Sequence, residues 1–216
     1  MSQDSKPRLL IADDHTLVLE GIGKLLENDV EMVGTVEDGR ALLPAVEQLR
    51  PDVILLDISL PLLNGIEACR QLMKSLPKAK VIFLTMHADV VYVEEALRAG
   101  GMGYLLKRSA ASELKAAIAA VMHGKRYITP LISWKQSAGD SKPQPANELG
   151  ADKLTPRQRE VLQLVAEGRS NKEIAALLHV SEKTVDFHKS AIKRQLMMTS
   201  TAELTQFAIK HRIIGT

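Results

Sequence analysis

The chain contains a single cysteine and lacks any long apolar run. One cysteine, Cys69, cannot form an internal disulfide, which is typical of proteins in a reducing compartment. No apolar run approaches the roughly 18 residues that cross a membrane, and the first residues show no secretory signal. We therefore expect a cytoplasmic protein with no membrane partner. Because Cys69 lies among apolar residues of a predicted helix, we interpret it as a packed thiol.

Positive and negative side chains nearly balance over the whole chain, but they are unevenly distributed along it. The net charge of the 216 residues is only +2. Residues 1–130 carry 15 Lys and Arg against 17 Asp and Glu, whereas residues 151–216 carry 11 against 7. A basic C-terminal part favours an anionic partner there. Surfaces that bind nothing also carry a surplus of this size, so charge alone assigns no partner.

The first part of the chain alternates short apolar runs with helical patterns. The expected strands are Leu9–Ala12, Met32–Val36, Val53–Leu56, Val81–Leu84 and Gly103–Leu106. The expected helices cover about 15–27, 39–50, 64–75, 90–99 and 110–123. This alternation indicates β-α-β units with helices on both faces of a parallel sheet. We predict an α/β fold: a doubly wound, five-stranded parallel sheet of flavodoxin-like size.

The pattern changes after this part of the chain. Residues 133–153 contain prolines and glycines and little apolar content, which is typical of a linker. Beyond them only helical patterns occur, over about 155–167, 171–178, 182–197 and 201–211. Thr155 and Pro156 form a good helix start, and the short turn before residue 182 indicates a helix-turn-helix. We therefore predict three parts: residues 1–127, a linker 128–152, and an all-α domain 153–216.

Polar residues stand at the ends of four predicted strands. They are Asp13 and Asp14, Asp57, Thr85 and Lys107, in strand order. Ligands of open parallel sheets bind at the carboxyl ends of the strands, so we expect these side chains to lie together. Carboxylate oxygens suit Mg²⁺, and a lysine with a hydroxyl suits a tetrahedral anion. An aspartate can also act as a nucleophile and form an aspartyl phosphate, and Asp57 is the candidate.

Residues 182–197 form an amphipathic helix with a basic face. Its inward face is expected to contain Val185, Ile192 and Leu196. The opposite face carries Lys183, Phe187, Ser190 and Arg194, flanked by Asp186 and Lys193. An exposed aromatic ring there suits thymine methyl groups, and the expected phosphate contacts are Lys172, Thr184, Lys189 and Lys193. A surface helix with spare lysines is the alternative.

Residues 8–125 resemble the receiver domain of two-component response regulators. The resemblance rests on the acid pair Asp13–Asp14, on Thr85, Tyr104 and Lys107, and on the stretch DISLPLLNGIE from Asp57. It implies that Asp57 is the phosphoacceptor and Lys107 a phosphoryl contact. Mg²⁺ would be held by the acid pair, Asp57 and the backbone carbonyl of Ser59.

The same resemblance suggests a switch between two side-chain positions. It implies that Thr85 and Tyr104 respond to phosphorylation, although Tyr104 as a plain packing residue remains open. Ser59 and His87 lie two residues past Asp57 and Thr85, at positions that tune phosphate lifetime in the family. An ordinary loop histidine is an equally open interpretation of His87.

Residues 154–213 resemble the DNA-binding domain of LuxR-type and NarL/FixJ-type regulators. The matching stretches are LTPRQREVLQLVAEG, SNKEIA and SEKTVDFH. Asp186 stands where several relatives carry a basic base-contacting residue, so their site preference does not transfer. Met197 stands where relatives usually carry a helix-ending glycine, which leaves the form of the next turn open.

Together the two resemblances imply a DNA-binding transcriptional regulator and not an enzyme. A sensor histidine kinase would phosphorylate Asp57, and the change would control homodimerisation and binding to double-stranded DNA. One alternative is a Mg²⁺-dependent phosphohydrolase with Asp57 as nucleophile, although Ser59 stands where a second acid is expected and no Walker A loop occurs. The other is a DNA-binding regulator that does not depend on phosphorylation.

Overall fold

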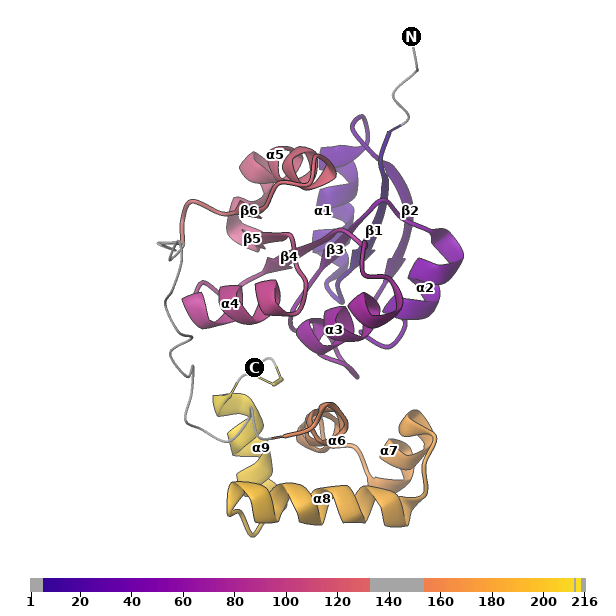
Figure 1. The fold of residues 1–216 in the computed structure, drawn as a ribbon, viewed down its shortest axis with the longest axis vertical. Helices are drawn as coiled ribbons and strands as arrows, with labels where there is room; N and C mark the ends of the chain where they lie inside the picture. The colour runs from indigo at the N-terminus through magenta and orange to yellow at the C-terminus, as the bar shows by residue number, and fades with distance from the viewer. Residues whose placement is uncertain (1–5, 133–153, 212, 215–216) are drawn as a thin grey trace. The chain divides into compact units, whose positions relative to one another are not determined.

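The chain divides into two compact units, each with its own core (Figure 1). The structure is a computed structural model that describes residues 6–132, 154–211 and 213–214. Most of the predicted linker, residues 133–152, therefore lies outside the described residues.

A parallel sheet of six strands forms the first unit, in the order β2-β1-β3-β4-β5-β6. The strands are β1 (Arg8–Ala12), β2 (Glu31–Val36), β3 (Val53–Leu56), β4 (Val81–Thr85), β5 (Gly103–Leu106) and β6 (Tyr127–Ile128). The first five follow the apolar runs of the sequence, and β1, β3, β4 and β5 are almost wholly buried. The doubly wound parallel fold is confirmed, but the prediction of five strands is wrong.

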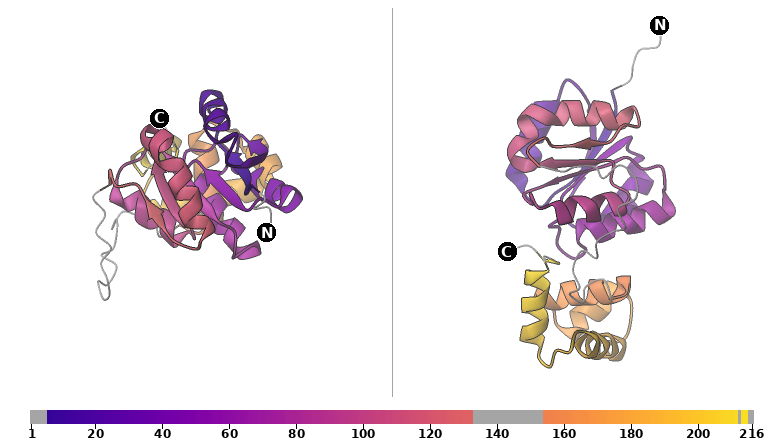
Figure 2. Two further views of the ribbon diagram at one scale, coloured as in Figure 1. Left: turned by 90° about the horizontal axis from the view of Figure 1, so that it is seen from above. Right: turned by 60° about the vertical axis from the view of Figure 1, so that its left-hand side comes forward.

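Two layers of helices cover the sheet (Figures 1 and 2). Helices α1 and α5 lie on one face and α2, α3 and α4 on the other. Their bounds are α1 (Thr16–Leu26), α2 (Leu42–Leu49), α3 (Gly65–Ser75), α4 (Val90–Arg98) and α5 (Ala110–Met122), with a short 3₁₀ helix η1 (Lys107–Ser109) before α5. Leu114, Ile118 and Val121 of α5 are buried against the sheet, as their spacing predicts.

Helix α2 begins three residues later than expected. The Asp38 carboxylate accepts hydrogen bonds from the backbone N–H of Arg40 at 2.8 Å and of Ala41 at 2.9 Å. Such a side-chain bond to the backbone holds a turn and competes with helix formation. The helix therefore starts at Leu42, after the turn.

The sixth strand, β6, was missed because its two residues form no apolar run. Tyr127 pairs with Gly103 and Ile128 with Tyr104 of β5. Strand β6 exists because β5 offers it hydrogen-bonding groups, a property of the folded sheet and not of local sequence.

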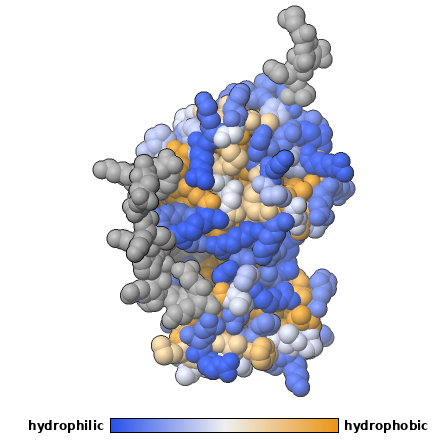
Figure 3. Space-filling view, in the orientation of Figure 1, coloured by the Kyte–Doolittle hydropathy of each residue, from blue (hydrophilic) through white to orange (hydrophobic). Residues whose placement is uncertain are grey.

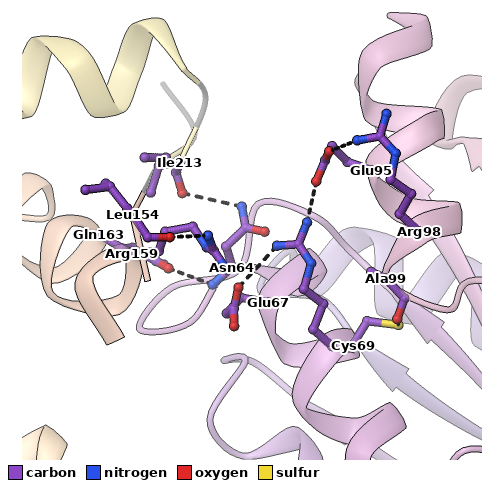
Figure 4. Close-up of polar contacts among 11 residues, drawn as sticks. Asn64, Glu67, Cys69, Glu95, Arg98, Ala99, Leu154, Arg159, Gln163 and Ile213 are labelled. Carbon is purple, nitrogen blue, oxygen red and sulfur yellow. Dashed lines mark hydrogen bonds and ion pairs between the residues drawn. The ribbon is translucent and has the colours of Figure 1, made fainter. Parts of the chain in front are cut away.

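Ion pairs and a thiol hydrogen bond join α3 to α4 (Figure 4). Arg70 of α3 pairs with Glu67 of its own helix at 3.2 Å and with Glu95 of α4. Beside them the Cys69 thiol donates to the carbonyl of Ala99 at 3.5 Å. Burial raises the pKa of Cys69 to about 12, so the thiol keeps its proton. The prediction of a packed thiol is confirmed.

Four helices form the second unit around a single apolar core. They are α6 (Pro156–Ala166), α7 (Asn171–Leu178), α8 (Glu182–Leu196) and α9 (Thr201–Lys210). Thr155 caps α6 and exchanges hydrogen bonds with Gln158, as the sequence predicts for this helix start. Val185 and Ile192 of α8 are fully buried, which confirms the inward face of that helix.

Met197 ends α8 in the conformation that usually belongs to glycine. Its backbone has φ +55° and its side chain is 91% exposed. The N–H of Met198 donates to the carbonyl of Lys193 at 2.8 Å, which completes a left-handed helix end. The turn thus keeps the glycine-type form although methionine occupies it.

Replacing Met197 with glycine should therefore stabilise the second unit. A side chain in the left-handed region is strained, so Met197→Gly should raise the free energy of unfolding by about 0.5–1 kcal/mol. Denaturant unfolding of the full chain measures the change. Met197→Ala keeps the strain and is the matched control; equal stability of the two variants would contradict the prediction.

Hydrophilic side chains cover most of the visible face of each unit, with smaller apolar patches between them (Figure 3). Among the described residues, no helix has the length and apolarity that a bilayer span requires.

Candidate functional site

A largely buried lysine, Lys107, bridges two buried aspartates at the carboxyl ends of β1, β3 and β5. Asp13 and Asp57 are 1% and 3% exposed. The Lys107 ammonium lies 2.7 Å from Asp57 Oδ2 and 2.8 Å from Asp13 Oδ2. The sheet brings these residues together because each one directly follows a buried parallel strand. The predicted convergence of Asp13, Asp57 and Lys107 is therefore observed.

Lys107 and Asp57 each affect the pKa of the other. Burial raises the pKa of Asp57, and the neighbouring Lys107 ammonium opposes that shift. Burial alone would lower the pKa of Lys107, but hydrogen bonds and charges from Asp13 and Asp57 outweigh it and raise the pKa. The lysine thus stays charged and stabilises two carboxylates that have little access to water.

Asp14 lies at the rim of the site beside a histidine. Its carboxylate is 2.9 Å from His15 Nδ1, which is also 3.0 Å from Asp13 Oδ1. Ligand atoms of Asp13, Asp14, His15 and Asp57 all lie within 4.8 Å of one another. This acidic cluster is compatible with a divalent cation. Sequence reasoning assigned no role to His15, although its place next to the acid pair was the available signal.

Thr85 and Tyr104 are both fully buried and meet at His87. The backbone N–H of His87 donates to Thr85 Oγ1 at 3.3 Å. The Tyr104 hydroxyl donates to the His87 carbonyl at 2.8 Å. The aromatic ring therefore points inward, and it contacts the same loop that carries the Thr85 hydroxyl.

The His87 ring lies between Ser59 and Tyr92. Its Nε2 is 3.0 Å from Ser59 Oγ. Its ring stacks on Tyr92 of α4, with ring centroids 4.2 Å apart and planes 15° apart. His87 is half-buried, and its ring therefore links the loop after Asp57 to α4.

Gly65 is required where α3 begins next to the Asp57 backbone. A Cβ atom at Gly65 would lie 1.9 Å from the Asp57 carbonyl oxygen. We expect Gly65→Ala to lower the free energy of unfolding by about 1–3 kcal/mol, because the backbone must shift. In contrast, Gly21→Ala in α1 meets nothing within 4 Å and should stabilise the helix by up to about 1 kcal/mol. Chemical denaturation of the two variants checks the pair; equal effects would be inconsistent with this packing.

Helix α8 presents its polar face to solvent. Phe187 is 66% exposed, and Lys183 and Ser190, one turn away on either side, are exposed as well. The other predicted contacts divide into exposed Lys172, Lys183, Asp186, Ser190 and Arg194 and half-buried Thr184, Lys189 and Lys193. All lie on α8 except Lys172, which is on α7. Their contacts with DNA stay predictions.

Asn171 joins two of these residues, a contact that the sequence did not reveal. Its side-chain amide donates to Asp186 Oδ1, and its carbonyl oxygen accepts from Lys189 Nζ at 2.9 Å. The first residue of α7 thus holds two charged side chains of α8. Thr184 is also engaged, since its hydroxyl lies 2.9 Å from that of Ser181, the N-cap of α8.

Comparison with known proteins matches both units. The family model for the response regulator receiver domain matches residues 9–119, and the model for bacterial regulatory proteins of the luxR family matches residues 152–208. The transcriptional regulatory protein MctR of Rhizobium johnstonii is 36% identical over 217 residues, which cover 100% of this chain and 99% of MctR.

Two further relatives match nearly the full length. The oxygen regulatory protein NreC of Staphylococcus aureus is 37% identical over 216 residues, covering 96% of this chain and 99% of NreC. A solved structure of two RcsB dimers bound to two parallel DNAs is 30% identical, with a TM-score of 0.56, and covers 94% of this chain and 98% of RcsB. By their names, MctR is a transcriptional regulatory protein and NreC an oxygen regulatory protein.

Proposed function

This chain belongs to the response regulators that join a receiver domain to a LuxR-type DNA-binding domain, and we propose that phosphorylation of Asp57 controls its DNA binding. The observation that carries the proposal is the Lys107 ammonium between two buried carboxylates, Asp13 and Asp57. A cation fixed at this point can also contact an oxygen of a phosphoryl group on Asp57.

The proposed reaction is phosphoryl transfer from a phosphohistidine of a sensor kinase. An Asp57 carboxylate oxygen attacks phosphorus, the phosphorus–nitrogen bond breaks, and the imidazole nitrogen keeps the electron pair. Lys107 lies where it can neutralise charge on the transferred group. The Ser59 backbone N–H donates to the same carboxylate and helps to orient it.

The oxygen donors at this site fit Mg²⁺. Asp13, Asp14 and Asp57 supply carboxylates, and we propose the Ser59 carbonyl as a further ligand. Hard oxygen ligands with room for water are the set that Mg²⁺ prefers. When bound, Mg²⁺ supplies positive charge next to the phosphoryl oxygens.

The proposed switch residues are Thr85 and Tyr104. A phosphoryl group on Asp57 brings new acceptor oxygens, and the Thr85 hydroxyl, which now accepts from His87, can donate to one of them. A shift of Thr85 changes the loop that also holds the Tyr104 hydroxyl. Phosphorylation is thus transmitted to the aromatic residue through His87.

The proposed DNA interface is the polar face of α8 with Lys172 of α7. Phe187 would contact bases. The proposed phosphate contacts are Lys172, Lys183, Thr184, Lys193 and Arg194. Because Asn171 already holds Asp186 and Lys189, we assign these two mainly to the geometry of the face. A homodimer when phosphorylated and a cytoplasmic location complete the proposal. We also propose that the receiver extends beyond the predicted boundary at residue 127, because β6 ends at Ile128 and Ile132 is buried.

Phosphate incorporation tests the assignment of Asp57. The full chain is incubated with Mg²⁺ and acetyl phosphate, and the intact mass is measured. Wild type should gain one phosphoryl group that alkali removes, as expected of an acyl phosphate, and Asp57→Asn should gain none. The control Asp29→Asn changes an exposed acid paired with Lys115 and should label as wild type does. Equal labelling of Asp57→Asn would overturn the proposal.

A further inference from the structure

Four polar side chains fasten β6 to the start of α5. Thr129, which is fully buried, donates its hydroxyl proton to Glu113 Oε1 at 2.9 Å. The Tyr127 hydroxyl donates to Glu113 Oε2 at 3.2 Å. Ser109 Oγ lies 3.3 Å from Thr129 Oγ1. We call these four residues, Ser109, Glu113, Tyr127 and Thr129, the β6 clasp.

The hydroxyl protons of the clasp have defined directions. Thr129 donates its single hydroxyl proton to Glu113, and Ser109 donates its own to the Leu106 carbonyl at 3.1 Å, so the 3.3 Å Ser109–Thr129 contact is a close approach of two hydroxyl oxygens. Burial and the neighbouring Glu113 both raise the pKa of the Tyr127 phenol, so it keeps its proton and donates. Within the clasp, Thr129 is therefore the member that contacts Ser109 of η1 and donates to Glu113 of α5.

The clasp is connected to the Asp57 site through η1. Lys107, whose ammonium contacts Asp13 and Asp57, is the first residue of this three-residue helix. Ser109, whose hydroxyl contacts Thr129, is the last. A displacement of the lysine backbone therefore displaces a member of the clasp.

Tyr104 provides a second connection. Its hydroxyl reaches the His87 carbonyl next to Thr85. Its backbone carbonyl accepts from the Thr129 N–H at 2.9 Å, and Ile128 is its partner in the β5–β6 pairing. One residue thus contacts the switch loop with its side chain and β6 with its backbone.

We propose that Thr129 is a positioning residue that carries a change at the Asp57 site into β6, and from there to the chain that leads to the DNA-binding domain. The inference rests on the proposed phosphorylation of Asp57. Both connections, Lys107 through Ser109 and Thr85 through Tyr104, end on this residue. Three residues after Thr129, the N–H of Ile132 donates to the Thr129 carbonyl at 3.1 Å. The clasp therefore fixes where the chain leaves the sheet.

Thr129→Val in the full chain separates this role from simple stabilisation. The change keeps the shape of the side chain and removes the hydroxyl. The readout is the ratio of DNA dissociation constants without and with Mg²⁺ and beryllofluoride, a phosphoryl mimic, on a duplex selected from a random-sequence pool with wild type. The variant should keep the basal affinity and lose at least about fivefold of the beryllofluoride-dependent gain, and Thr129→Ser should restore it. An unchanged gain in Thr129→Val would overturn the inference.

Hydrogen exchange on wild type tests the same idea without a variant that has to fold. Beryllofluoride should change the exchange rates of the Tyr127 and Thr129 amides, which donate to the carbonyls of Met102 and Tyr104. Unchanged rates at both, in a protein whose DNA affinity does respond, would overturn the inference alone. If wild type gained no DNA affinity with beryllofluoride and also incorporated no phosphoryl group at Asp57, the proposed function itself would be overturned.

Discussion

Lys107→Met should lower the free energy of unfolding of the receiver by about 3 kcal/mol in the absence of divalent cations. The side chain is only 9% exposed, and it contacts two carboxylates that are themselves buried. Removing its charge leaves Asp13 and Asp57 side by side without the ammonium that lies between them. Denaturant unfolding of the full chain measures the loss, and Mg²⁺ should restore part of it because a cation replaces the missing charge.

Lys115→Met is the matched control for this prediction. Lys115 pairs with Asp29 at 2.9 Å, but both side chains are about half exposed. Exposed pairs contribute roughly 0–1 kcal/mol, so this variant should unfold almost as wild type does. If the two variants lost the same stability, or if Mg²⁺ restored none of the stability lost by Lys107→Met, Lys107 would not hold the acidic site together.

Reversing two charges on α8, in Lys183→Glu/Lys193→Glu, should weaken binding to every duplex by at least about tenfold at moderate salt. Lys183 is exposed and Lys193 half-buried, one near each end of the polar face. Each lost phosphate contact also removes one released counterion. The slope of log affinity against log salt should therefore become shallower by about two per protomer.

Lys210→Glu provides the control, because it reverses one exposed charge near the end of α9, away from α8 in sequence. It should leave the salt slope unchanged. A fluorescence titration of a random-sequence duplex at several salt concentrations measures all three proteins. A double variant with the slope of wild type would show that the polar face of α8 is not the phosphate-binding surface.

The predictable part of the receiver is the part in which local sequence and sheet topology agree. The strand ends at Asp13, Asp57, Thr85 and Lys107 follow buried apolar runs, and a parallel sheet brings such ends to one edge. Hydrophobic spacing likewise predicts the buried face of α8, because it depends only on the helical repeat. These elements needed no knowledge of distant contacts.

The elements that were missed depend on contacts between distant segments. Strand β6 forms because β5 pairs with it, and the Thr129–Glu113 hydrogen bond needs α5 beside it. Similarly, the bonds of Asn171 with Asp186 depend on how α7 packs next to α8. Sequence spacing carries little information on such contacts, since their partners are many residues apart.

The measurement that tests the central claim most directly is the DNA affinity of wild type and Asp57→Asn, each with Mg²⁺ alone and with Mg²⁺ plus beryllofluoride. The substitution keeps the side-chain shape but removes the carboxylate that would coordinate the mimic. We expect beryllofluoride to increase the affinity of wild type only. Equal affinities of both proteins under both conditions would contradict control by Asp57 and favour a regulator that does not depend on phosphorylation.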